Sequence, residues 1–258
     1  MQHVKQLLSL EGRTALVTGG GGGLGGAMAL ALAQAGADIV LFDLHAEPMK
    51  QNAALIEKEK RRCVMVGGDV RRVEDIERAV QTAVTQLGRL DIAVNSAGVN
   101  IRKPAHELTL AEWRQVIDIN LTSAFLCSRD AHPHLKRAGG GKIINIGSMM
   151  SIFGASFAPA YAASKGGIVQ LTKATAVAWA PDNIQVNAVL PGWIDTELTR
   201  NARTEVKGLH EGVLARTPAG RWGTIDDMEG IAIFLASTAS DFITGTAIPV
   251  DGGYAVKG

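Results

Sequence analysis

The 258-residue sequence predicts a single-domain α/β fold, a doubly wound parallel sheet of about seven strands with helices on both faces. Short runs rich in β-branched residues alternate almost strictly with stretches of helical periodicity. The runs are apolar throughout rather than at every second position, so helices should cover both faces of the sheet. The expected strands span residues 14–17, 38–42, 63–66, 90–94, 142–146, 184–189 and 247–250. The expected helices span residues 24–35, 48–60, 74–87, 109–138, 159–180 and 226–236.

The domain organisation follows from the lack of any internal boundary in the sequence. No linker, repeat or low-complexity tract divides the chain, so residues 1–258 are expected to form one domain. The one shift in composition is a charged and polar segment at 196–216, between Pro191 and Pro218. Such a segment beside a parallel sheet predicts a mobile flap over the functional site.

The composition excludes several classes of partner. Lysine and arginine number 26 against 25 aspartates and glutamates, so no net field draws the protein to nucleic acid or an anionic membrane. The surroundings of Cys63 and Cys127 are apolar, which predicts buried free thiols in a reducing compartment such as the cytoplasm. Residues 1–10 have no apolar stretch of signal-peptide length. A small-molecule ligand is therefore expected.

A glycine-rich turn follows the first expected strand and precedes a helix. Thr18 and Gly19 begin a run of glycines that continues through Gly23, Leu24 and Gly25. Glycines let the backbone approach a pyrophosphate, and the free N–H groups of the helix start donate to it. The turn predicts a dinucleotide site, although several glycine frames overlap and a flexible loop without a ligand is the alternative.

An acidic residue ends the second expected strand. Asp43 lies 24 residues after Gly19, where a carboxylate would meet the adenosine ribose hydroxyls and repel a 2′-phosphate. No Arg or Lys occurs in residues 18–38 to neutralise such a phosphate, so NAD is the expected cofactor. The alternative is that Asp43 only caps a helix or turn.

The candidate acid/base is a tyrosine with a lysine four residues later. Tyr161 and Lys165 would share one helix face. At about 4 Å and an effective dielectric near 20, their attraction is about 4 kcal/mol. That attraction would lower the tyrosine pKa from about 10 towards about 7. Unless this is only a surface pair, the phenol could exchange protons near neutral pH.

Two further polar residues lie at informative places. Ser148 follows the strand at 142–146, 13 residues before Tyr161, and its hydroxyl could hold a substrate oxygen. Asn120 lies inside an apolar helical stretch, where it either bonds backbone or water locally or is a misplaced polar residue.

Taken together, these motifs resemble the short-chain dehydrogenase/reductase family in order and spacing over nearly the whole chain. The motifs are Thr18-Gly19-x-x-x-Gly23-x-Gly25, Asp69-Val70, Asn95-Ser96-Ala97-Gly98, Asn120, Ser148, Tyr161-x-x-x-Lys165 and Pro191-Gly192. The family more often has a second asparagine where this chain has Ser96. The resemblance implies a Rossmann-type fold with Tyr161 as the acid/base.

The resemblance also implies roles for the other site residues. Lys165 would lower the Tyr161 pKa and hold the nicotinamide ribose, Ser148 would orient the substrate oxygen, and Asn120 would anchor a water relay. The implied contacts to the dinucleotide are Gly19, Gly23, Leu24, Asp43, Asp69, Val70, Asn95, Gly98, Tyr161, Lys165, Pro191, Gly192, Ile194 and Thr196.

Three segments, at 100–102, 142–149 and 218–223, resemble the gluconate 5-dehydrogenase and 2-deoxygluconate 3-dehydrogenase branch of the family. This implies an NAD-dependent oxidoreductase that interconverts a secondary alcohol and its ketone, on a polyol, sugar or sugar acid. The alternatives are a 3-oxoacyl-carrier-protein reductase and a non-catalytic NAD-binding regulator. Family members form dimers or tetramers through the helices here at 109–138 and 159–180, so a homotetramer is expected.

Candidate substrate contacts complete the prediction: Arg102, Ser148, Met149, Tyr161 and Trp193. Arg102 follows the 95–98 turn, where a guanidinium would pair with a carboxylate unless it is a solvated loop charge. Trp193 either walls the pocket or lies in the core. The pair His132 and His134, separated by a proline, is not expected to bind a metal.

Overall fold

The computed structural model describes residues 2–257; Met1 and Gly258, the ends of the expected domain, lie outside the described residues. A seven-stranded sheet with the order β3-β2-β1-β4-β5-β6-β7 forms its centre, and every neighbouring pair of strands is parallel. The strands are β1 (Thr14–Thr18), β2 (Asp38–Asp43), β3 (Cys63–Gly67), β4 (Ile92–Asn95), β5 (Gly141–Ile146), β6 (Ile184–Pro191) and β7 (Ala247–Val250). The predicted doubly wound fold is confirmed.

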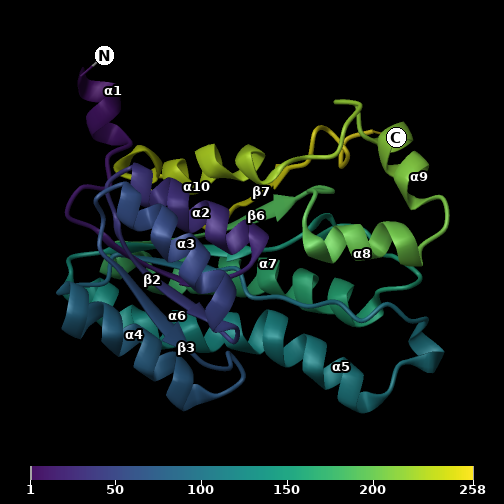
Figure 1. Ribbon diagram of the computed structural model, residues 1–258, viewed down its shortest axis with the longest axis horizontal. Coiled ribbons are helices and arrows are strands. Elements are labelled where there is room, and N and C mark those ends of the chain that lie inside the picture. Colours follow the sequence, from purple (N-terminus) through teal and green to yellow (C-terminus); the bar gives the residue numbers. More distant parts are fainter. Residues whose placement is uncertain (1, 258) are drawn as a thin grey trace.

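The helices lie in two layers around this sheet (Figure 1). They are α1 (Gln2–Leu7), α2 (Gly23–Gln34), α3 (Ala46–Lys58), α4 (Val73–Leu87), α5 (Leu110–Ile117), α6 (Ser123–Arg137), α7 (Pro159–Trp179), α8 (Glu197–Glu205), α9 (Leu209–Arg216) and α10 (Glu229–Ala236). Helices α2, α3 and α10 cover one face of the sheet, and α4, α6 and the end of α7 cover the other.

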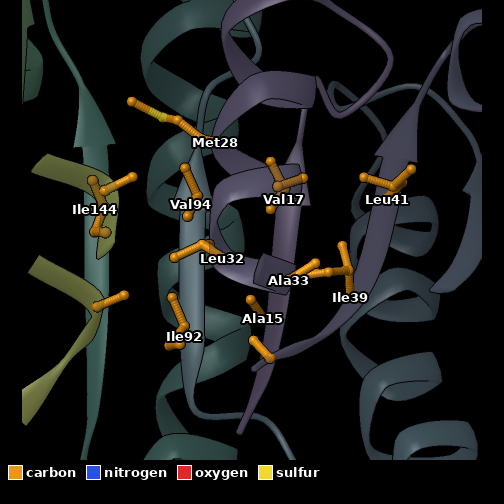
Figure 2. Packing of buried hydrophobic residues seen from close by; sticks show 14 of the residues in the cluster. Ala15, Val17, Met28, Leu32, Ala33, Ile39, Leu41, Ile92, Val94 and Ile144 are labelled. Atoms are coloured by element: carbon orange, nitrogen blue, oxygen red, sulfur yellow. The ribbon is translucent and has the colours of Figure 1, made fainter. Parts of the chain in front are cut away.

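Alternate residues of each strand divide between the two layers, as the pleat of a strand requires. Val17 of β1 packs in the layer of α2, whereas its neighbour Leu16 packs in the layer of α4 and α6. Figure 2 shows Met28 and Leu32 of α2 over strand residues such as Val94. Because alternate residues of a strand pack against helices on opposite faces, the strands are mostly apolar, which is the pattern that predicted the fold. Exceptions are Lys142 and Asn145 of β5 and Gln185 and Asn187 of β6.

The structure differs from the predicted elements at four places. The single helix expected over 109–138 is interrupted by a π-helical turn, η2 (Asp118–Thr122), which separates α5 from α6. Helix α10 is preceded by a 3₁₀ turn, η5 (Ile225–Met228). The predicted flap at 196–216 consists of α8 and α9, and the short helix α1 was not predicted.

Both cysteines are free, as expected, with Cys127 buried and Cys63 half-buried. Burial raises the pKa of each thiol to about 12, which keeps both protonated at neutral pH. Within residues 2–257, no helix is both long enough and apolar enough to cross a membrane.

The core prediction compares two leucines. Leu32 of α2 packs against the sheet and is 0% exposed, whereas Leu55 of α3 is 41% exposed. Leu32→Ala should lower the free energy of unfolding by about 2–5 kcal/mol, because it removes buried contacts and leaves a cavity. Leu55→Ala is the control and should change it by less than about 1 kcal/mol. Urea unfolding followed by circular dichroism at fixed protein concentration measures both. Equal losses would contradict the assignment of Leu32 to the core.

Candidate active site

An open cavity of about 890 Å³ lies at the carboxyl ends of the central strands, beside α8. Ligands of open parallel α/β sheets bind at this edge. Twelve residues named from the sequence line it: Leu24, Gly98, Arg102, Ser148, Met149, Tyr161, Lys165, Pro191, Gly192, Trp193, Ile194 and Thr196. The fold therefore brings together residues more than 160 positions apart, from Leu24 to Thr196.

A second cavity of about 750 Å³ extends along the same edge towards β2. It shares Ser96 and Gly98 with the first cavity. Four more predicted cofactor residues line it: Gly19, Asp43, Asp69 and Val70. The two cavities form a track from Asp43 to Tyr161, which suits an elongated dinucleotide.

The glycine turn is shaped for close backbone approach. Gly19 has a positive φ of 69°, and a Cβ at this position would lie 2.9 Å from the backbone of Ala97. A Cβ on Gly25 would overlap the carbonyl oxygen of Gly19. Side chains are therefore excluded where the turn meets the helix, which leaves the bare backbone that a pyrophosphate needs. The residues present fit a dinucleotide cofactor.

Asp43 is fixed by the turn that it faces. Its carboxylate accepts hydrogen bonds from Gly21 N (3.0 Å) and His45 N (3.1 Å). Both alternatives from the sequence therefore apply, because Asp43 caps a turn and also lines the second cavity. Arg71 lines this cavity as well and forms an ion pair with Asp69. Arg71 was not among the site residues predicted from the sequence, and its position two residues after Asp69 was the available signal.

Ser148 and Tyr161 are the candidate residues for proton transfer. The Ser148 hydroxyl accepts from Met150 N (3.1 Å), and Ser148 N donates to Ser151 Oγ (3.2 Å). Ser151 Oγ in turn donates to Lys165 O (2.7 Å), which ties the loop after β5 to α7. Burial raises the pKa of Tyr161, whereas a hydrogen bond with Ser148 and the charge of Arg102 lower that pKa.

Lys165 does not act on Tyr161 in the way predicted from their spacing. Its ammonium lies 5.6 Å from the centroid of the Tyr161 ring and donates to Ile146 O (2.7 Å). Burial lowers the pKa of Lys165 from 10.5 to about 8. The predicted fall of the phenol pKa towards neutrality is therefore wrong for this structure: burial outweighs the charges, and the favourable charge comes from Arg102.

Asn120 is buried in the π-helical turn η2, and its carboxamide bonds two distant segments of the chain. It accepts from Val99 N (2.8 Å) and donates to Val99 O (2.9 Å) and Ser164 Oγ (3.1 Å). Neither alternative from the sequence is observed, because the bonds are not local and the amide is fully used. A Cβ on Gly98 would lie 3.5 Å from Asn120 Oδ1 and 3.6 Å from Lys165 Nζ, so both polar groups converge behind Gly98.

Two residues of the predicted cofactor set lie outside both cavities. Asn95 is buried, and its amide donates to Asn145 Oδ1 (2.7 Å) and Ser128 Oγ (2.9 Å). Asn145 donates to Thr172 Oγ1 (2.9 Å), so these side chains link β4 and β5 to α7. Gly23 begins α2 and faces Thr196. An asparagine inside the apolar run 142–146 was the overlooked signal for this buried network.

Arg102 and Trp193 both lie in the cavity wall. The Arg102 side chain is only 11% exposed, donates to Leu198 O (2.8 Å) and pairs with Glu205 (2.8 Å), so it is not a solvated loop charge. It ties the loop after β4 to α8. Trp193 packs edge-to-face on Trp222 with ring centroids 5.5 Å apart.

Three arginines hold the flap helices against the rest of the domain. Besides Arg102, Arg203 of α8 lies 3.7 Å from the ring centroid of Trp222, whose Nε1 donates to His210 of α9 (3.1 Å). The third, Arg216, lies 4.5 Å from the ring centroids of both Phe153 and Tyr254. Figure 1 shows α8 and α9 together at one end of the sheet. None of these three anchors was predicted.

The arrangement suits transfer of a proton between Tyr161 and a substrate oxygen held by Ser148. Further residues that line this cavity were not predicted as site residues: Ser96, Asn100, Ile146, Gly147, Met150, Phe157, Ala158, Leu198 and Thr199. Apart from Ile146 at the end of β5, they come from loops and from the flap, where periodicity carries no signal.

Comparison with known proteins identifies the family. Residues 20–255 match the model of a family described as enoyl-(acyl carrier protein) reductase. The chain is 41% identical to the 2-dehydro-3-deoxy-D-gluconate 5-dehydrogenase of Bacillus subtilis (strain 168) over 254 residues, which cover 98% of this chain and 99% of that protein.

Solved structures agree. A gluconate 5-dehydrogenase from Burkholderia cenocepacia J2315, in complex with NADP and tartrate, has a TM-score of 0.92 at 37% identity, covering 98% of each chain. A short-chain type dehydrogenase/reductase from Mycobacterium marinum has a TM-score of 0.93 at 33% identity, covering 98% of this chain and 99% of that one. Because a family model and relatives match almost from end to end, the chain belongs to the short-chain dehydrogenase/reductase family, a group of oxidoreductases that bind a nicotinamide cofactor.

Proposed function

We propose that this protein is an NAD-dependent dehydrogenase that interconverts a secondary alcohol and its ketone on a sugar acid. The observation that carries the proposal is the guanidinium of Arg102 in the same cavity as Ser148 and Tyr161. Arg102 uses two of its five N–H donors on Glu205 and Leu198, so the remaining donors would bind a carboxylate, which a sugar acid offers and a neutral sugar does not. The names of the Bacillus and Burkholderia relatives support the same substrate class.

The chain's own residues supply orientation and a proton path. Ser148 would hold the reacting oxygen, and Tyr161 would take its proton during oxidation and return it during reduction. A nicotinamide cofactor, when bound, would supply the hydride acceptor for the carbon that carries this oxygen. Lys165, buried beside Ile146, would hold the ribose next to it, and Leu24, Pro191, Gly192, Ile194 and Thr196 would enclose that end of the cofactor.

The preference for NAD rests on Asp43. Its carboxylate lines the second cavity, where it would accept bonds from ribose hydroxyls and repel a 2′-phosphate. Arg71 lies in the same wall, but its charge is paired with Asp69. Since the Burkholderia relative was solved with NADP, cofactor choice is compared directly below.

A homotetramer is proposed as the working form. Exposed apolar side chains lie on the helices expected to form the contact, with Trp113 on α5, Phe125 on α6 and Val177 on α7. Two free thiols support an expected location in the cytoplasm.

A substrate screen tests the proposal against its rivals. Reduced cofactor is measured with aldonates, neutral polyols, aldoses and 3-hydroxyacyl thioesters. Turnover only with thioesters would favour a 3-oxoacyl-carrier-protein reductase. Cofactor binding without any turnover would favour a non-catalytic regulator, although Ser148, Tyr161 and Lys165 are all present.

The first site prediction concerns the proton carrier. Tyr161→Phe should lower kcat by about 10²- to 10⁴-fold while NADH still binds, because only the acid/base is lost. Since burial raises the Tyr161 pKa above its usual value of about 10, wild-type oxidation should speed up as the pH rises from about 7 to about 10. Ketone reduction should stay nearly constant over that range, because the phenol remains mostly protonated. Steady-state rates and NADH fluorescence titration measure these effects. Activity within tenfold of the wild type would refute the assignment.

The second site prediction concerns the choice between NAD and NADP. Asp43→Ala should weaken NAD use by about 10- to 100-fold and raise the ratio of NADP to NAD use, since it removes a charged acceptor. Asp43→Asn is the control: it keeps the size and one acceptor for the turn but lacks the charge, so it should improve NADP while preserving more NAD activity. The measurement is kcat/KM with each cofactor. Equal use of both by the wild type would count against Asp43 as the selector.

The third site prediction concerns the contact between Arg102 and the carboxylate of the substrate. Arg102→Ala should raise KM for an aldonate by about 10- to 100-fold, the value of a charge-assisted contact, and leave KM for a neutral polyol nearly unchanged. Glu205→Gln is the matched control, because it removes the ion pair to the flap and keeps the guanidinium. A similar rise for both substrates, or the same rise in Glu205→Gln, would mean that Arg102 serves the flap instead.

A further inference from the structure

The cavity wall contains two polar atoms that no group in residues 2–257 satisfies. Within the described part of the chain, Asn100 Oδ1 and Trp193 Nε1 are buried without a hydrogen-bond partner, and both residues line the cavity of Tyr161. Buried polar atoms nearly always have a hydrogen-bond partner, so an atom without one is a candidate contact for a ligand. The indole of Trp193 is braced by Trp222, whereas a carboxamide can turn about one side-chain bond.

Hydrogen bonds anchor the chain on both sides of Asn100, through the backbone of Val99 and through the side chain of Arg102. Val99 is bonded through its N–H and its C=O to the Asn120 carboxamide. Two residues later, Arg102 is bonded to Glu205 and to the carbonyl of Leu198. The Asn100 carboxamide therefore makes no hydrogen bond of its own, although the chain on both sides of it is anchored. A binding site presents a preorganised polar group in this way.

The surroundings of Asn100 are largely apolar. Met149, Met150, Phe157, Ile194 and Leu198 line the same cavity. In such a pocket, a small number of placed polar groups orients the ligand. Ser148 and Tyr161 are occupied by the reacting oxygen and Arg102 suits a carboxylate, which leaves Asn100 for another group of the substrate.

We propose that Asn100 is a specificity residue that hydrogen-bonds a second hydroxyl group of the substrate, besides the one that reacts. Its carboxamide turns to present its oxygen or nitrogen, both of which pair with a hydroxyl. The proposal rests on the proposed function and deepens it: among sugar acids, the preferred substrates carry a hydroxyl group at the position that Asn100 contacts.

The experiment combines an enzyme variant with substrate analogues. Asn100→Leu keeps a similar size and removes all hydrogen bonding. The substrates are gluconate, its deoxy analogues that each lack one non-reacting hydroxyl, and a monohydroxy acid. With the wild type, one deoxy analogue should lose about tenfold or more in kcat/KM relative to gluconate. Asn100→Leu should show that loss on gluconate and no further loss on that analogue.

Asn201→Leu makes the same change at an exposed position of α8 outside both cavities, and this control variant should treat all the substrates like the wild type. Thermal unfolding of each variant checks that the fold is retained. An equal loss on every substrate, or no loss with gluconate, would overturn the role of Asn100 and leave the proposed function standing.

Failure of the proposed function gives a different result. If the wild type oxidises a neutral polyol and no sugar acid, the same comparison on that polyol and its deoxy analogues decides the role of Asn100. If the wild type accepts only substrates with a single hydroxyl, both proposals are overturned.

Discussion

Polar side chains buried in an apolar sheet need hydrogen-bond partners. In this protein, those hydrogen bonds fix the position of the candidate active site. Asn95, Asn145 and Thr172 form a buried chain of hydrogen bonds from β4 through β5 to α7. Helix α7 carries Tyr161 and Lys165, and the Lys165 ammonium donates back to Ile146 at the end of β5. The same bonds that satisfy the interior therefore hold the acid/base against the edge where the strands end.

Burial also dominates the electrostatics of that site. It raises the Tyr161 pKa and lowers the Lys165 pKa, so both groups are shifted towards their neutral forms. The opposing influence on the phenol comes from Ser148 and from Arg102. Arg102 is held by α8 through Glu205 and Leu198, so the position of the flap and the proton affinity of Tyr161 are linked through one guanidinium.

The fold was predictable because its signals are local. Apolar runs, helical periodicity and the glycine turn gave the sheet, its layers and the cofactor edge, and twelve named residues do line one cavity. The π-helical turn around Asn120 was not predictable, since one extra residue in a turn leaves the periodicity of α5 and α6 almost unchanged. The pairing of Arg102 with Glu205, 103 positions apart, exists only in three dimensions. The expected effect of Lys165 on Tyr161 failed because spacing gives proximity but not burial.

The attachment of the flap through Arg102, Trp222 and Arg216 separates two tasks within one cavity. The groups that handle the proton come from β5 and α7, whereas the wall that meets the rest of the substrate comes from the loop after β4 and from α8. Apart from Arg102, whose charge acts on Tyr161, residues of the wall can be substituted while the groups that handle the proton stay in place. Proteins with this arrangement can therefore differ in the substrates that they accept while they catalyse the same type of reaction.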